Sequence, residues 1–513
     1  MRIIKYNILL LILILAGACE NWLDVNEDPN NPSEMDYEMV LSSGITSVTY
    51  VLGGKYQILG ALWSQHWTQS MGASQYAGID SYDINSSTYD DRQWGELYSG
   101  CLEALEYVRR ESSKEGSWNH YLVATVMQAF TFQILVDLYD EIPFSEALQG
   151  EDLQLEPHYE KGQDIYDSLI ARIDYALSKD FEDDELKELG EEDIIFDGDI
   201  DQWIAFANTL KLKIYLRQSE VRPEVAQAGI QAMYDEEVDF LTTDAAFIHF
   251  QDESGRRNPL YETEEIVLGS NPNLVLSKTL HSYLEENNDF DRLDYMFYTP
   301  DNGGSHYSLV QGNYNDPEEP AGTNSASYSK PIFIPTYPVY LMSLTEADFL
   351  QAEAMMRYGV GTYDDAKELY EEGFTDAYVR VLSISSLSMS QIVRDAETFL
   401  HTGNYAFPSE GSPVEDFVEV IIMQKWVSLA GIQSLETFFE HNRTGYPKMS
   451  DVLSDDDSYE PGEFTVSVNN VTSGQMPKRL IWPESEYQGN RNTPDKKEVW
   501  EKVWWDTKTE TSE

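Results

Sequence analysis

The sequence predicts an all-α fold that carries long irregular loops. Apolar residues recur with the helical period in several long segments, and polar stretches too long for ordinary turns separate these segments. Hydrophobic residues make up 42% of the 513 residues, which is enough for a substantial core. Length alone would favour two or three domains, but helical and repeat folds extend further as one unit. We therefore expect a single helical domain over residues 36–513.

The first residues have the pattern of a secretory signal. Arg2 and Lys5 give a positive start, and residues 8–15 are an unbroken apolar run. Small residues at 16–18 then precede Cys19. The apolar run is too short for a transmembrane helix. Small residues followed directly by a cysteine resemble a bacterial lipobox, so we expect the signal to end before Cys19.

A lipid anchor on Cys19 is the expected result of this signal, with residues 1–18 removed as the signal peptide. Acyl chains contribute about 0.8 kcal/mol per buried methylene, so several chains hold a protein firmly. Residues 19–35 are rich in Asn, Asp, Glu and Pro, which predicts an extended tether. An ordinary cleaved signal without lipid is the alternative. We expect no later stretch to be long and apolar enough to span a membrane.

Helical periodicity is clearest in seven segments of the remaining chain. They cover residues 92–110, 118–139, 160–179, 201–217, 345–358, 363–382 and 414–441. In the first, the apolar residues from Trp94 to Val108 follow one stripe, as in a helix that packs on a core. The second is strongly apolar throughout.

The segment 345–382 is predicted to be a helical hairpin. Gly361, Tyr363, Ala366 and Tyr370 follow a small and aromatic packing pattern similar to that of tetratricopeptide repeats. The period is not regular along the chain. We therefore expect degenerate hairpin repeats with long insertions between them.

Three insertions stand out by length and composition. They cover residues 71–91, 298–330 and 450–476. The first two contain several tyrosines among Gly, Ser and Asn, and the third is acidic and rich in serine. Loops this long in a compact protein are usually functional, so we expect the binding face there.

The chain is strongly acidic, because 91 acidic and 34 basic residues give a formal net charge of −57. Such a surface repels phosphate backbones, so nucleic acid is not an expected partner. Anionic polysaccharides and lipid headgroups are disfavoured for the same reason, unless a local basic patch overrides it.

No catalytic constellation emerges from the sequence. It lacks Gly-x-Ser-x-Gly, His-Glu-x-x-His and a phosphate-cradling glycine loop. Asp197, Asp199 and Asp201 alternate as calcium ligands do, but the rest of an EF-hand is missing, so we favour a turn with a helix N-cap. A structural calcium ion stays open, and no other cofactor is expected. We expect both His66 and Cys101 to be packed in the interior.

Six local sequences together resemble the SusD/RagB family of nutrient-binding lipoproteins. They are the lipobox, WSQHWTQS at 63–70, DLYDEIPFSEAL at 137–148, DIDQWIAFANTLKLKIYLR at 199–217, QKWVSLAGIQSLETFFEHNRTGYP at 424–447 and PKRLIWPESEYQGN at 477–490. The matches span about residues 20–505. Six motifs in the right order are far more specific than any one of them. Asp140 stands where the family pattern has Gly, a departure that affects a turn.

The resemblance implies a lipid-anchored protein on the extracellular face of the outer membrane of a Bacteroidetes species. It implies degenerate tetratricopeptide-like hairpins on one side of the fold and irregular loops on the other. It also implies a partner, a SusC-like TonB-dependent transporter, over whose barrel the protein acts as a hinged lid. Family members bind oligosaccharides, or in some cases peptides, and are not enzymes. Most motifs are structural, so Trp94, Asp137, Trp203 and Arg443 are expected in the core or in turns.

Two ligand classes are compatible with these loops. Sugar rings stack their C–H faces on aromatic side chains, and their hydroxyls pair with polar side chains. We therefore favour an oligosaccharide, with ligand contacts from Tyr76, Tyr82, Tyr89, Tyr307 and Tyr314. Packing within its own loop is the alternative for each tyrosine. A peptide ligand, for which backbone hydrogen bonds matter more, and an extracellular glycosidase remain alternatives.

Overall fold

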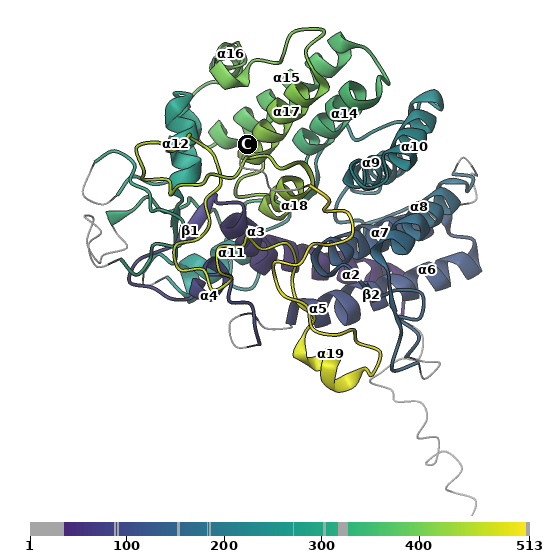
Figure 1. Cartoon of the computed structure of the whole chain (residues 1–513). Helices are drawn as coiled ribbons and strands as arrows, with labels where there is room; N and C mark the ends of the chain where they lie inside the picture. Colours follow the sequence, from purple (N-terminus) through teal and green to yellow (C-terminus); the bar gives the residue numbers. More distant parts are fainter. Residues whose placement is uncertain are drawn as a thin grey trace, which may run out of the picture.

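The computed structural model shows a mainly helical protein (Figure 1), as the sequence predicts. It describes residues 35–86, 89, 92–150, 154–181, 183, 186–269, 271–300, 304–316, 327–401 and 403–508. The predicted signal peptide, the lipid site at Cys19 and the tether up to residue 34 lie outside the described residues. One large hydrophobic core extends through most of the helices.

The helices of the N-terminal half pack on one another in succession. They are α2 (Tyr37–Val51), η1 (Leu52–Tyr56), α3 (Gln57–Trp63), α5 (Arg92–Gly95), η2 (Glu96–Leu102), α6 (Glu103–Glu115), α7 (Trp118–Tyr139), α8 (Gly162–Leu177), α9 (Ile200–Arg217) and α10 (Pro223–Asp235). Helix α7 contacts α6, α8 and α9, and α9 also contacts α10 and α14. The π-helical segments η1 and η2 join their flanking helices without a gap.

The C-terminal half continues the helical stack. Its helices are α12 (Lys278–Glu286), α13 (Phe290–Met296), α14 (Leu344–Tyr358), α15 (Tyr363–Leu382), α16 (Met389–Phe399), α17 (Val414–Ser428), α18 (Ser434–Thr444) and α19 (Glu484–Gly489). The predicted hairpin is formed by α14 and α15, and α17 packs against both (Figure 1). Short helical turns occur at α4 (Ala77–Asp80), α11 (Pro259–Tyr261), η4 (Glu262–Val267) and η6 (Gly403–Tyr405).

Strand structure in the described residues is limited to three short antiparallel pairs. They join β1 (Trp67–Gln69) to β5 (Leu274–Leu276), β2 (Ile142–Pro143) to β3 (Tyr159–Glu160), and β4 (Ala245–Phe247) to β6 (Val339–Met342). The pair β1–β5 lies at the base of the first predicted loop.

The prediction of a single helix over residues 414–441 is wrong, because this segment forms two helices, α17 and α18. Gly431 lies between them with φ of +79°, and its N–H donates to Ser434 Oγ at 3.1 Å. The turn brings α18 against α3 so closely that a Cβ on Gly60 would lie 2.2 Å from the Leu435 nitrogen. Apolar periodicity continues across this turn, so it gives no sign of the change in direction.

Helix α7 contradicts the expectation that no later stretch is apolar enough to span a membrane. By length and composition it is apolar enough to cross a membrane, although we expected no such stretch after the signal. Its apolar window is 100% buried inside the protein. The helix is therefore the centre of the core, and its lack of a polar side follows from neighbours on all sides.

The residues predicted to be structural are buried. Trp94, Asp137, Trp203 and Arg443 all lie in the interior. Cys101 is buried beside Thr131, and burial raises the pKa of its thiol to about 12.

Two further structural expectations are also confirmed. The ring of His66 bonds Ser434 Oγ and the Trp426 carbonyl, and burial lowers its pKa to about 3. Asp199 is the N-cap of α9, where its side chain accepts hydrogen bonds from the backbone N–H groups of residues 201 and 202.

Five helices meet at a buried ion cluster. Its members are Lys213 and Arg217 on α9, Glu346 and Glu353 on α14, Lys425 on α17, Glu436, Glu440 and Arg443 on α18, and Asp137 on α7. The guanidinium of Arg217 lies 2.5 Å from both Glu436 and Glu440 and 3.2 Å from Asp137. Lys213 bridges Glu346 at 2.9 Å and Glu436 at 2.8 Å, and Arg443 lies 2.7 Å from Glu353.

The cations of the cluster lower the pKa of Glu436 and Glu440 despite burial. Arg217, Lys213 and Lys425 hold the pKa of Glu436 at about 2, and Arg443, Lys425 and Arg217 hold that of Glu440 well below its usual range. Both carboxylates therefore stabilise the fold above pH about 4.5, and this contribution is lost as pH falls toward 2.

Replacing Glu440 with Gln should lower the free energy of unfolding by about 3–5 kcal/mol, because it leaves buried cations without their counter-charge. Urea unfolding followed by circular dichroism at pH 7 measures the loss. The variant should also lose less stability than the unmodified protein between pH 4.5 and 2. Glu224→Gln on the exposed start of α10 is the control and should change stability by less than about 0.5 kcal/mol. Equal stability of the two variants would contradict a coupled ion cluster.

Candidate functional site

The three long insertions converge on one side of the helical stack. We call them the first loop (described residues 71–86 and 89), the second loop (298–300, 304–316 and 327–330) and the third loop (450–476). The Tyr314 hydroxyl of the second loop donates to the Ala77 carbonyl of the first at 3.3 Å. The third loop joins both, because its N–H groups at 468 and 471 donate to carbonyls at 311 and 81. The sequence shows the loops, but only the fold shows that they form one unit.

Asp80 is the polar centre of this unit. Its carboxylate accepts hydrogen bonds from Thr68 Oγ1 at 2.8 Å, the Gln69 N–H at 2.9 Å and Gln311 Nε2 at 2.5 Å. Burial raises its pKa to about 6, although each of these donors acts in the opposite direction. The carboxyl therefore ties the first loop to β1 and to the second loop.

Two of the five predicted ligand tyrosines are buried in this unit. Tyr76 and Tyr82 are each only 2% exposed. The Tyr76 hydroxyl donates to Glu264, and burial raises its pKa. The Tyr82 hydroxyl contacts Met476 Sδ at 3.0 Å and accepts the Ser467 N–H at 3.1 Å. Both rings pack the loops together. For these two positions the structure therefore shows packing, which was the alternative to ligand contact, and neither ring face is open to a ligand in this conformation.

Of the other three predicted tyrosines, Tyr307 and Tyr314 lie closer to solvent. Tyr314 is half-buried against a small apolar cluster that includes Tyr328. The ring of Tyr307 is 36% exposed and lies 5.3 Å from that of Tyr328. Tyr89 is mostly buried and lines a separate pocket of about 240 Å³ with Trp482 and other residues. Stacking of a ligand ring on Tyr307 and Tyr314 stays a prediction.

Tyr298 is a candidate that the sequence did not single out. It is 46% exposed, and the Lys330 ammonium lies 5.3 Å from its ring centre. Its N–H donates to the Lys330 carbonyl at 2.9 Å, while the Ser329 N–H donates to the Tyr307 carbonyl at 2.8 Å. These bonds place Tyr298 and Tyr307 on either side of the segment 329–330. In the sequence, the only feature that pointed to Tyr298 was its position at the start of the second insertion.

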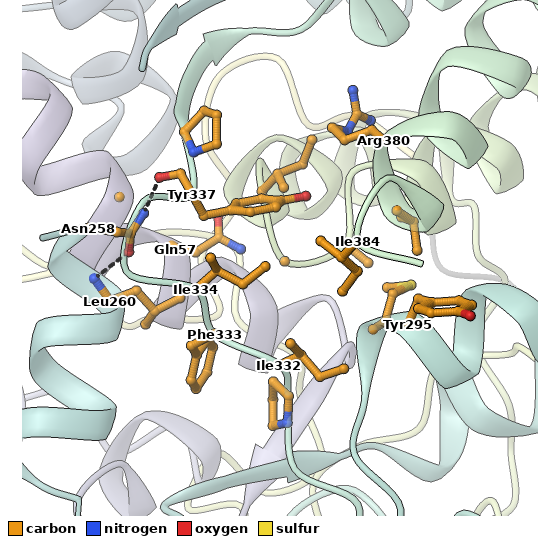
Figure 2. Close-up of a pocket in the computed structure, with 18 of the residues that line it drawn as sticks. Gln57, Asn258, Leu260, Tyr295, Ile332, Phe333, Ile334, Tyr337, Arg380 and Ile384 are labelled. Carbon is orange, nitrogen blue, oxygen red and sulfur yellow. Dashed lines mark hydrogen bonds between the residues drawn. The ribbon is translucent and has the colours of Figure 1, made fainter. Parts of the chain in front are cut away.

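A pocket of about 80 Å³ lies where the chain enters and leaves the 298–330 insertion (Figure 2). Figure 2 shows Ile332, Phe333 and Ile334 along one wall of the pocket, and Tyr295, which belongs to α13, to the right of Ile332. Asn258 fixes this wall, because its Nδ2 donates to the Tyr337 carbonyl at 2.9 Å. The lining is mainly apolar, so the pocket can hold an apolar group but is too small for a whole sugar ring with its hydroxyls.

A metal centre is not formed by the described residues, in which no group of three His, Cys, Asp or Glu side chains could hold an ion. Asp199 is used as a helix cap, as noted above. The structural calcium ion left open by the sequence therefore gains no support from this geometry.

Comparison with known proteins gives a family and a fold. A family model described as starch-binding and associating with the outer membrane matches residues 29–483. No curated protein matches the chain. A solved structure of a chitin-binding protein matches with a TM-score of 0.71 and 22% identity, over 92% of this chain and 100% of its own.

Two further structures have the same fold. A SusD homolog from Bacteroides uniformis matches with a TM-score of 0.70 and 20% identity, over 92% of this chain and 100% of its own. A chitin-binding SusD homolog from Flavobacterium johnsoniae matches with a TM-score of 0.69 and 18% identity, over 91% and 99%.

Replacing Gly312 with Ala should loosen the junction of the second and third loops. Gly312 has φ of +75°, and an added Cβ would lie 1.9 Å from Ser467 Oγ. Gly116→Ala is the matched control, because Gly116 has φ of +73° and open space around it. The control should lose about 1–2 kcal/mol of unfolding free energy from backbone strain alone. Gly312→Ala should lose clearly more in the same urea titration, and an equal loss would show that the loops do not pack closely there.

Proposed function

The chain belongs to the SusD-like family, and from this premise we propose that it captures uncharged oligosaccharides with the face formed by the first and second loops. It acts as a binding protein and not as an enzyme. The single observation that carries the proposal is the pair of exposed tyrosines, Tyr298 and Tyr307, on adjacent segments of that face.

Comparison supports a glycan as the ligand class. The family is described as starch-binding, and two of the similar structures are those of chitin-binding proteins. Starch and chitin are both uncharged chains of sugar rings. An uncharged ligand also suits a chain with a formal net charge of −57, which would repel an anionic one.

The geometry of the loops favours an open site over an enclosed one. The pockets of about 80 and 240 Å³ near the loops are smaller than the roughly 300–1,000 Å³ that encloses a small molecule. Exposed aromatic rings can instead stack sugar faces along the surface. The ammonium group of Lys330 lies beside the same segments, is partly exposed and can bond ring hydroxyls. Such a surface binds several sugars of a chain weakly, which suits capture followed by release.

A peptide ligand is less well supported by the described fold. Extended peptides commonly bind by adding a strand to an exposed sheet edge. The strands of the described residues are only two to four residues long, so they offer little edge for such pairing. The peptide class therefore stays an alternative without an observation in its favour.

In the proposed mechanism the protein delivers the glycan to a SusC-like TonB-dependent transporter in the outer membrane and covers it as a lid. The description of the family as associating with the outer membrane supports this location. The lipobox before Cys19 supports attachment by lipid at the extracellular face. Weak binding by the lid is sufficient, because closure adds the contacts of the transporter only when a glycan is present.

Replacing Tyr298 or Tyr307 with Ala should weaken oligosaccharide binding by about 1–2 kcal/mol each, the scale of burying part of an aromatic ring. Calorimetry with maltooligosaccharides and chitooligosaccharides measures the change and identifies which sugar binds. Tyr50→Ala is the matched control, because Tyr50 is exposed on α2, away from the loops. The tyrosines would be excluded as contacts if all three variants bound like the unmodified protein.

Replacing Cys19 with Ala should release the protein from the outer membrane, because it removes the acylated side chain. Membrane fractionation and labelling with a palmitate analogue should be done in cells that lack the transporter, so that the partner cannot retain the protein. Cys101→Ala, which alters only the buried thiol, should stay membrane-bound and labelled. Retention of Cys19→Ala in the membrane would disprove the anchor.

A further inference from the structure

A long acidic groove lies on the helical side of the molecule. In Figure 1 the helices α14, α15 and α16 that border it are at the top, away from α4 of the first loop. The groove has a volume of about 780 Å³, and residues 238–242 form part of its lining. Seven carboxylates line it: Asp239, Asp348, Glu368, Glu371, Glu372, Asp376 and Glu397. Its lining contains no lysine or arginine.

Apolar side chains share the groove with these carboxylates. They are Val238, Phe240, Leu241, Leu344, Leu369, Val393 and Leu400. A partner that fits must therefore carry positive charge and apolar surface together. The side chains of lysine and arginine combine both, because an apolar stem supports the charged head.

Asp348 is an acidic group of the groove that no cation of the described residues balances. Its side chain lines the groove from α14, yet the residue is only 4% exposed. Its carboxyl forms no hydrogen bond and no ion pair with any other described residue. A buried carboxyl of this kind destabilises the fold unless a positive group meets it.

The groups around Asp348 increase this imbalance. Burial raises the pKa of Asp348 to about 8, and the nearby acids Asp376 and Glu372 on α15 and Asp244 before β4 add to this shift. Burial raises the pKa of Asp376 although Arg380 opposes the shift, and the Arg380 guanidinium donates to the Ser428 carbonyl and to Thr345 Oγ1. Among the described residues, no other cation shifts the pKa of Asp348, Glu372 or Asp376.

The carboxylates of the buried ion cluster differ from Asp348 in having cation partners. There every carboxylate lies within ion-pair distance of a lysine or arginine. In the groove, Lys367 lies 3.6 Å from Glu371 at the rim, but the buried carboxyl of Asp348 has no such partner among the described residues. Since no group of three described His, Cys, Asp or Glu side chains is arranged to chelate a metal, an organic cation with an apolar stem suits the groove better than a bare ion.

We propose that this groove is a docking site for a partner protein, which inserts a segment that carries lysine or arginine among apolar residues. Asp348 meets the inserted ammonium or guanidinium group, and the carboxylates of α15 and α16 surround it. The site lies outside the sugar-binding face, so it does not depend on the proposed ligand.

Docking at this site also releases a proton. Asp348 is mostly protonated at pH 7 in the free protein, and an inserted cation stabilises the carboxylate. Affinity for the cationic segment should therefore rise with pH up to about 8 and then level off.

The test uses a fluorescent peptide of alternating leucine and lysine as the probe, with a leucine–glutamate peptide for comparison. Fluorescence anisotropy of the mature protein at low salt should show binding of the lysine peptide only. Asp348→Asn should weaken it about tenfold, the scale of one charge-assisted hydrogen bond. Glu224→Gln, which removes one surface charge from α10 outside the groove, should leave affinity within about twofold.

Unfolding of the same variants shows whether Asp348 serves folding instead. Because the pKa of Asp348 is raised in the folded state, its charge destabilises the protein increasingly from pH about 4 to 8. Asp348→Asn should therefore be more stable than the unmodified protein at pH 9 and similar to it at pH 4.

Three outcomes would overturn the proposal. One is equal binding of the lysine peptide to Asp348→Asn and Glu224→Gln, which would mean non-specific attraction. Another is a loss of stability in Asp348→Asn at pH 9, which would mean that the carboxyl has a structural partner. The third is displacement of the peptide by calcium but not by sodium at equal ionic strength, which would identify a metal site.

Discussion

The buried ion cluster is the constraint on which the rest of the structure depends. Moving an ionised side chain out of water costs several kcal/mol, and only a close partner of opposite charge offsets that cost. Arg217 meets three carboxylates from two other helices, and Lys213 bridges α14 and α18. A shift of any of these helices by one turn would leave a charge unpaired in the core. The cluster therefore sets the register of the helical stack more strictly than apolar packing does.

A stack with a fixed register gives the loops a firm base. The loops themselves are held by polar contacts, with Asp80 receiving donors from β1 and the second loop. Tyr76 and Tyr82 fill the space between the loops, and their hydroxyls form hydrogen bonds within the protein. Tyrosine thus has two roles on this side of the molecule. Buried rings hold the loops together, and the rings of Tyr298 and Tyr307 remain at the surface for contact with a ligand.

Acidic side chains also have two different roles in this molecule. In the core cluster each carboxylate is paired, and the pairing lowers the pKa values of Glu436 and Glu440. In the groove beside α14 the carboxyl of Asp348 is surrounded by other acids, and its pKa is raised. An acidic side chain therefore stabilises the fold in the core cluster and destabilises it in the groove. Proteins commonly accept such local instability where a surface must recognise a partner.

The sequence by itself determined the helical class, the bounds of α7, α9, α14 and α15, the family and the burial of Trp94, Asp137, Trp203, Cys101 and Arg443, because these follow from local periodicity and from motifs of fixed spacing. It did not show several other helices, such as α2, α10 and α16. It did not determine the break between α17 and α18, since a left-handed turn at Gly431 interrupts no apolar pattern. It also did not show which loop tyrosines are buried. A tyrosine in a polar loop has the same neighbours in sequence whether its ring faces solvent or another loop. That choice depends on contacts between segments more than two hundred residues apart, such as Tyr314 with Ala77, and only the tertiary structure makes them.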